Sequence, residues 1–199
     1  LTAGELGTRG NAALRAEEAA RASAIMGLAF RENLGLRDGF FDLSESNKMP
    51  IIRAVRKYRP EIVITNAIRD RHPDHGRASQ LVSESCFLSG LPKIEMEDNG
   101  QLLQAWRPKQ VYHMIQDRYI TPSICVDITP WIEKKNEAVL AFKSQFYDPV
   151  SSEPHTPISG LDFFEFLRAR AREMGRLIGV EYAEGYTMEG PVKKENLLL

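Results

Sequence analysis

Residues 61–76 read Glu61-Ile-Val-Ile-Thr-Asn-Ala-Ile-Arg-Asp-Arg-His-Pro-Asp-His-Gly76, and this stretch decides how the chain is expected to fold. The β-branched run 62–65 predicts a short strand, and the segment from about Gly76 to Ser89 has a helical composition. The loop between them carries two imidazoles and neighbouring carboxylates. In open α/β sheets, ligands bind beyond the carboxyl ends of the strands, so this loop is the first place to look for chemistry.

The spacing within this loop admits two readings. Pro73 fixes its own φ and biases His72 away from helical backbone, so the imidazoles of His72 and His75 are expected to point in different directions. One could bind a metal while the other faces a substrate, with Asp74 accepting the free N–H of His72 and stabilising its cationic form. The other reading is an ordinary helix N-terminus, with Asp74 as the cap and both histidines on the surface. The segment alone leaves both open.

Strands and helices are predicted to alternate along the rest of the chain. Helices are expected at Asn11–Met26, Lys48–Tyr58, Pro130–Lys143 and Leu161–Ile178, with Asn11 as an N-cap and Gly27 as a stop. Further strands are expected at Leu28–Leu34, Val111–Gln116, Ser123–Ile128 and Tyr182–Tyr186. This alternation favours βαβ units, so we predict an α/β, Rossmann-like fold with a mostly parallel sheet flanked by helices.

Composition indicates one soluble globular domain over residues 1–199, with 43% hydrophobic residues and a formal net charge of -1. The Pro- and Ser-rich loop Ser144–Pro157 is long enough to be a lid or substrate loop, and residues 187–199, which include Lys193-Lys194-Glu195, are expected to be a solvated tail. Lys and Arg total 26 against 27 Asp and Glu, without a basic run flanked by aromatic residues, so we expect no nucleic-acid partner.

The two cysteines, Cys86 and Cys125, lie in apolar surroundings and are expected to be buried free thiols in a reducing compartment. Apolar stretches are too short to span a bilayer, so no membrane partner is expected. Together these features predict a cytoplasmic protein.

Five separated segments carry a specific resemblance. They are Gly4–Gly10, Arg31–Phe41, Asp70–Gly76, Lys143–Pro149 and Gly179–Gly185. The chain resembles the LmbE-like (PIG-L type) zinc-dependent N-acetylglucosaminyl deacetylases, and is most similar to those of bacillithiol biosynthesis that act on N-acetylglucosaminyl-malate. The resemblance implies metal-assisted hydrolysis of the N-acetyl group of an N-acetylglucosamine conjugate, with release of acetate.

The same resemblance assigns roles to individual residues. His75 matches the family's zinc ligand, and His72, oriented by Asp74, matches the residue that stabilises the oxyanion or protonates the leaving amine. Fe(II) suits such ligands as well as zinc does. The family takes its other two ligands and its base from an Ala-His-Pro-Asp-Asp segment, which this sequence does not contain. We therefore expect an N-terminal portion with the first strand and metal-binding loop to be missing, and the 199 residues alone to be inactive.

Four further residues are candidates for substrate binding. A malate group carries carboxylates, which guanidinium groups bind bidentately, so Arg15, Arg71 and Arg9 are expected near the substrate. For each of them the alternative is a surface ion pair. His113 could line the pocket, although a histidine within an apolar strand is more often a core residue with satisfied hydrogen bonds. His155 is expected to be exposed.

The expected partner is a small-molecule glycoside with carboxylates, and the resemblance also makes a homo-oligomer plausible. Two other functions stay open. A non-catalytic sugar-binding or assembly protein of the same fold would lack the metal, but His72, Asp74 and His75 would then serve no purpose. A nucleotide-binding domain is disfavoured because no Gly-rich phosphate loop follows any predicted strand.

Overall fold

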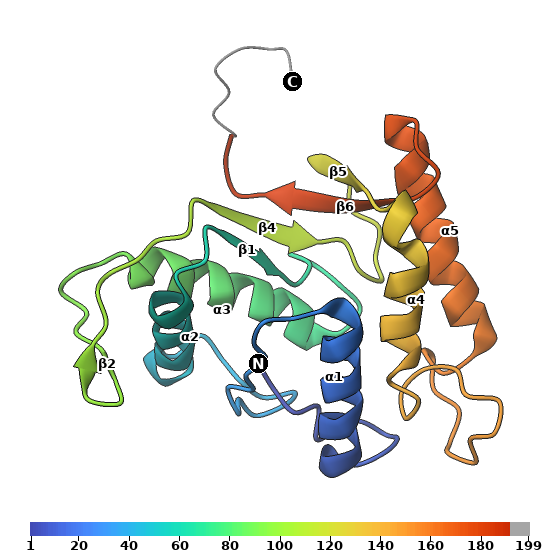
Figure 1. The fold of residues 1–199 in the computed structure, drawn as a ribbon, viewed down its shortest axis with the longest axis horizontal. Coiled ribbons are helices and arrows are strands. Elements are labelled where there is room, and N and C mark those ends of the chain that lie inside the picture. Colours follow the sequence, from blue (N-terminus) through green and yellow to red (C-terminus); the bar gives the residue numbers. More distant parts are fainter. Residues whose placement is uncertain (192–199) are drawn as a thin grey trace. The chain divides into compact units, whose positions relative to one another are not determined.

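The computed structural model describes residues 1–191, and Figure 1 shows its strands and helices. These elements fall into two compact units. Unit 1 consists of Leu1–Phe41 and Cys125–Glu184, and unit 2 consists of Asp42–Ile124 and the residues from Gly185 onward. The end of the predicted tail, from residue 192, lies outside the described residues. Residues 187 and 188, expected to be tail, belong instead to the last strand.

Unit 2 is built on a parallel pair of strands. β1 (Ile62–Thr65) pairs with β4 (Gln110–Met114), from Ile62 opposite Gln110 to Thr65 opposite His113. Helix α3 (Pro73–Ser89) contacts both strands, and α2 (Glu45–Tyr58) packs against α3. A short hairpin joins β2 (Glu97–Asp98) to β3 (Gln101–Leu102).

Both ends of α3 are held by specific hydrogen bonds. At its N-terminus, His72 has extended backbone, its imidazole accepts from the N–H of Asp74, and Pro73 occupies the first turn. At its C-terminal end, the buried guanidinium of Arg56 donates to the carbonyl oxygens of Ser89 (2.9 Å) and Leu91 (2.8 Å). These bonds satisfy backbone groups that the helix itself leaves without partners, and they fix the position of the histidine segment at its start.

Unit 1 contains three longer helices, most of one strand and the first two residues of another. Its elements are α1 (Ala12–Met26), β5 (Ile124–Asp127), the 3-10 turn η1 (Thr129–Trp131), α4 (Ile132–Leu140) and α5 (Leu161–Ile178). Helix α1 contacts α4, and a buried apolar cluster joins Ile128, Ile132, Ala171 and Tyr182. As predicted, Asn11 caps α1 by accepting from the N–H of Leu14, and Gly27 ends it with φ of 70°.

The last strand, β6 (Ala183–Met188), completes a mixed sheet with the order β1-β4-β6-β5. β6 runs antiparallel to β4, so the predicted α/β class is correct while the sheet is less parallel than expected. Bonds from the N–H groups of Ser123 and Ile128 to the carbonyls of Tyr186 and Tyr182 also make β5 antiparallel to β6.

Several predictions about local structure were wrong, and three of them concern a strand, a helix and the cysteines. Leu28–Leu34 forms no strand; Leu28 and Phe30 are exposed there, so the segment buries too little apolar surface to hold an extended pairing. The helix predicted for Pro130–Lys143 is shorter, beginning as a 3-10 turn and ending at Leu140. Both cysteines are free, but only Cys86 is buried, whereas Cys125 is half-buried.

Within residues 1–191, no helix is both long and apolar enough to cross a bilayer.

Candidate functional site

The histidine segment lies in unit 2, directly beyond the carboxyl end of β1, as the sequence predicted. The connection between β1 and α3 is tied to the residues that follow β4. The side-chain oxygen of Gln116 accepts from the N–H of Ala67 (3.0 Å) and from the side-chain amide of Asn66 (3.1 Å). The N–H of Arg118 donates to Asp70 Oδ1 at 2.8 Å. The loop that leads to His72 and the start of α3 is therefore bonded to the segment after β4, at the edge of the sheet where ligands bind in such folds.

His75 is held by a carboxylate that the sequence interpretation did not single out. Nδ1 of His75 lies 2.5 Å from Oδ2 of Asp70, whose side chain is completely buried, while the side chain of His75 is 32% exposed. Burial raises the pKa of Asp70, but hydrogen bonds from the backbone of Arg118, the imidazole of His75 and the backbone of Arg71 outweigh it, so the pKa lies below its usual value. An ionised carboxylate only accepts hydrogen bonds, so the shared proton resides on Nδ1 of His75.

The imidazole of His72 lies beside that of His75, with ring centroids 5.4 Å apart and planes tilted by 34°. Its Nδ1 accepts from the N–H of Asp74 at 3.2 Å, so in this geometry the ring proton is on Nε2. We expected the carboxylate of Asp74 to keep His72 cationic. Between these two residues the structure shows the contact through the N–H of Asp74, and the Asp74 carboxylate forms an ion pair with Arg77 at 3.2 Å. This arrangement leaves the Nε2–H of the exposed His72 as a hydrogen-bond donor.

The three candidate arginines all have partners within the chain. Arg71, with a side chain 47% exposed, forms an ion pair with Asp117 at 3.2 Å in unit 2. Arg9 and Arg15 belong to unit 1. Arg9 is buried and donates to Ser151 and to the carbonyl of Phe146.

Arg15 donates to the carbonyls of Gly4 and Arg9, so it supports the loop in which Arg9 lies. A Cβ at Gly7 would overlap the Arg15 guanidinium, which occupies that space. Of the three arginines, only Arg71 combines an exposed side chain with a position next to His72.

His113 is a buried histidine with both ring nitrogens engaged. Nδ1 lies 2.7 Å from the hydroxyl of Ser79 on α3, and Nε2 lies 2.8 Å from Oε1 of Glu189. This is the alternative that the sequence left open, a histidine whose hydrogen bonds are satisfied inside the fold, and it joins α3, β4 and the end of β6. His155 is exposed, as expected.

The residues around His75 fit one ligand of a transition-metal centre. Its Nδ1 is bonded to Asp70, and the described residues place no hydrogen-bond partner on Nε2, which is the pattern of a metal-binding histidine backed by a carboxylate. Among residues 1–191, no three His, Cys, Asp or Glu side chains are grouped closely enough to hold a metal ion. The fit is thus to a single ligand and not to a complete set.

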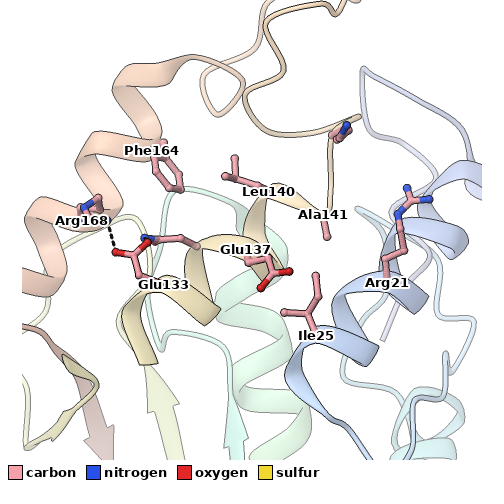
Figure 2. A pocket seen from close by; sticks show the side chains of 10 residues that line it. Arg21, Ile25, Glu133, Glu137, Leu140, Ala141, Phe164 and Arg168 are labelled. Carbon is pink, nitrogen blue, oxygen red and sulfur yellow. Dashed lines mark hydrogen bonds and ion pairs between the residues drawn. The ribbon is translucent and has the colours of Figure 1, made fainter. Parts of the chain in front are cut away.

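Unit 1 contains an open groove of about 570 Å³ between α1, α4 and α5 (Figure 2). It is lined by Arg21, Ile25, Glu133, Asn136, Glu137, Leu140, Ala141, Lys143, Phe164 and Arg168. Glu133 pairs with Arg168 at 3.1 Å, which ties α4 to α5 across one end. None of the candidate site residues lines this groove, and its lining contains no histidine or cysteine.

Comparison with known proteins supports the chemistry suggested by the histidine segment. The PIG-L family of GlcNAc-PI de-N-acetylases matches residues 1–86. A diacetylchitobiose deacetylase of Thermococcus kodakarensis is 31% identical over 193 residues, which cover 92% of this chain and 66% of that protein. The chain thus spans about two thirds of the length of this relative.

Solved structures give the same result. A conserved protein of Thermus thermophilus aligns with a TM-score of 0.84 and 34% identity over 98% of this chain and 81% of its own. The N,N'-diacetylchitobiose deacetylase of Pyrococcus horikoshii, solved with an inhibitor, has a TM-score of 0.74 and 26% identity over 94% of this chain and 70% of its own.

A 4-carboxy-2-hydroxymuconate hydratase of Pseudomonas putida has a TM-score of 0.70 over 94% of this chain and 75% of its own. At 21% identity it shows the fold alone. A shared fold therefore does not identify the reaction. Sequence identity and the His-Pro-Asp-His segment do reduce the number of candidate reactions. The chain belongs to the PIG-L (LmbE-like) family of N-acetyl deacetylases.

Proposed function

We propose that the protein hydrolyses the N-acetyl group of an N-acetylglucosamine conjugate in a zinc-dependent reaction, with N-acetylglucosaminyl-malate of bacillithiol biosynthesis as the substrate. Fe(II) is the alternative metal. The observation that carries the proposal is the pair of imidazoles at the start of α3, where His75 is backed by Asp70 and the adjacent His72 keeps an N–H donor. The free thiols of Cys86 and Cys125 support a reducing, cytoplasmic location.

The chain's own residues have distinct tasks in this reaction. His75 would hold the metal through Nε2. When bound, zinc lowers the pKa of a water molecule and polarises the acetamide carbonyl. His72 directs its Nε2–H toward the developing oxyanion, where this donor stabilises the charge. The proposal takes two further ligands and a base from the family's Ala-His-Pro-Asp-Asp segment, so tests of activity use the full-length protein.

The group attached to N-acetylglucosamine in the substrate has to be identified by comparing two candidate substrates directly. The relatives named above include two diacetylchitobiose deacetylases, which favours a neutral disaccharide as the second candidate. A malate group instead requires a cation, and exposed Arg71 next to His72 is available once it releases Asp117. Both substrates present the same acetamide to the same histidines.

The decisive measurement is acetate release by the full-length protein from N-acetylglucosaminyl-malate and from N,N'-diacetylchitobiose, with and without a chelator. His75→Ala and a matched surface change, His155→Ala, are assayed in parallel. Chelator-sensitive activity that is lost in His75→Ala and kept in His155→Ala supports the proposal. The ratio of kcat/KM for the two substrates then identifies the preferred one.

A folded, metal-loaded protein that releases no acetate from any N-acetylglucosamine conjugate would overturn the proposal. Binding of the same sugars without turnover would then favour a sugar-binding or assembly protein of this fold. Light scattering on the same sample tests the expected homo-oligomer.

A further inference from the structure

The burial of Asp70 and its hydrogen-bond partners could not be predicted from the neighbouring sequence. Asp70 is a completely buried carboxylate next to a partly exposed imidazole, and its two oxygens have different partners. Oδ2 faces Nδ1 of His75 at 2.5 Å, and Oδ1 accepts from the N–H of Arg118 at 2.8 Å. The carboxylate therefore joins the start of α3 to the segment that follows β4.

We propose that Asp70 is the positioning residue of the metal ligand: it holds His75 as the Nδ1–H tautomer and leaves Nε2 as the lone-pair donor for the metal. This inference rests on the proposed function in assigning a metal to His75. A free imidazole can place its proton on either nitrogen, and the Nε2–H tautomer cannot bind a metal through Nε2. Asp70 removes that choice before a metal arrives.

The pattern of donors explains why a carboxylate is needed. His75 Nδ1–H and Arg118 N–H both point at Asp70, so the side chain must accept twice. An asparagine there offers one oxygen and one NH2 group. If its oxygen serves Arg118, its NH2 faces Nδ1 of His75 and selects the Nε2–H tautomer. Asp70→Asn therefore changes the hydrogen-bond pattern with little change in side-chain volume.

The first test needs no metal and no activity. Long-range 1H–15N correlation spectra of the metal-free full-length protein, labelled with 15N-histidine, report the tautomer of each neutral ring. The His75 signals are assigned by their loss in His75→Gln. We expect the Nδ1–H form in the wild type and a shift toward Nε2–H in Asp70→Asn.

The second test measures zinc affinity by competition with a chromophoric chelator. Loss of a hydrogen-bonding partner behind a histidine ligand weakens metal binding by about 10- to 100-fold, which is the change expected for Asp70→Asn. Asp98→Asn is the matched control, because Asp98 is also a carboxylate of unit 2 in an ion pair, with Lys57 at 3.1 Å. The zinc affinity of Asp98→Asn should stay within about twofold of the wild type, since Asp98 lies outside the proposed site.

Separate outcomes test the inference and the proposed function. An Nε2–H tautomer at His75 in the wild type would overturn the inference, whether or not Asp70→Asn folds. Unchanged tautomer and affinity in a folded Asp70→Asn would overturn it as well. A wild type that shows the Nδ1–H tautomer but binds no zinc would instead overturn the proposed function, while supporting the hydrogen bond's effect on His75.

Discussion

The residues with the clearest chemical tasks are the two histidines at the start of α3, and His72 has two roles that can be separated. Its Nδ1 caps the helix by accepting from Asp74, and its Nε2–H is available to a substrate. Asparagine is a good N-cap but has no Nε2–H to direct at the oxyanion. We therefore expect His72→Asn to lower kcat by about 10²- to 10³-fold. Steady-state kinetics beside thermal unfolding check this.

The unfolding temperature of His72→Asn should stay near that of the wild type, because the cap is retained. His72→Ala, which removes both roles, serves as the comparison and should also be less stable by about 1 kcal/mol. Full activity in His72→Asn would show that His72 is only a cap.

Arg71 distinguishes the two candidate substrates. A charge-assisted hydrogen bond contributes about 1.5–3 kcal/mol, so Arg71→Met should reduce kcat/KM for N-acetylglucosaminyl-malate by about 10- to 100-fold. The same change should leave N,N'-diacetylchitobiose almost unaffected, since that sugar carries no carboxylate. Kinetics with both substrates measure the difference; an equal loss on the two would mean that Arg71 acts on the loop and not on malate.

At this scale the sequence predicted where the histidine segment lies, beyond the strand Ile62–Thr65, but not which groups hold its two imidazoles. The His72-Pro73-Asp74-His75 segment is contiguous, so the spacing is readable. Asp70 also lies in that stretch, yet its contact with His75 depends on the path of the loop and on the N–H of Arg118, 48 residues further on. The partners of His113 likewise come from distant elements.

At the scale of elements, periodic segments were the predictable ones. The strand Ile62–Thr65 and the helix Leu161–Ile178 have the predicted bounds because their apolar patterns are local. The helix at Pro73 begins three residues earlier than expected, since a capping histidine was not weighed as the start signal. The direction of β6 is set by its pairing with β4, which no local pattern encodes.

In helix α5, replacing Gly175 by alanine is expected to change stability in the direction opposite to the usual one. Replacing a helical glycine by alanine normally stabilises a protein by about 0.5–1 kcal/mol. At Gly175, however, a Cβ would lie 2.7 Å from the carbonyl oxygen of Val180 and 2.8 Å from that of Glu181, and backbone cannot easily move aside. We expect Gly175→Ala to destabilise the protein by about 1–3 kcal/mol in denaturant unfolding.

The control for this change is Ala169→Gly at an exposed position of the same helix, which should cost about 1 kcal/mol from helix preference alone. A stabilised Gly175→Ala would show that the turn after α5 is free to shift.

At the scale of the whole molecule, stability should decline in acid. The pKa values of Asp42, Glu84, Asp127 and Glu133 all lie below their ordinary values of 3.8 and 4.5, chiefly through hydrogen bonds from Ser44, Lys48, Thr129 and Arg168 respectively. Such groups stabilise the fold above their unfolded pKa values, and that stabilisation is lost as the pH falls through the lowered folded values.

We therefore expect the thermal midpoint to drop steadily below about pH 4.5, where the unfolded chain binds more protons than the folded one. Circular dichroism melts across this range measure it, and Asp127→Asn should show a shallower decline than the wild type. A midpoint that does not move in acid would mean that these carboxylates keep ordinary pKa values.

The strand β6 has a consequence for how the molecule opens. Ala183 and Glu184 belong to unit 1, while the strand from Gly185 onward belongs to unit 2 and pairs with β4. If the units open independently, amide hydrogen exchange along this strand changes rate abruptly after Glu184, since each side follows its own opening equilibrium. A uniform rate along the strand would mean that the chain has a single cooperative transition, and that a lesion in either unit exposes both to proteolysis.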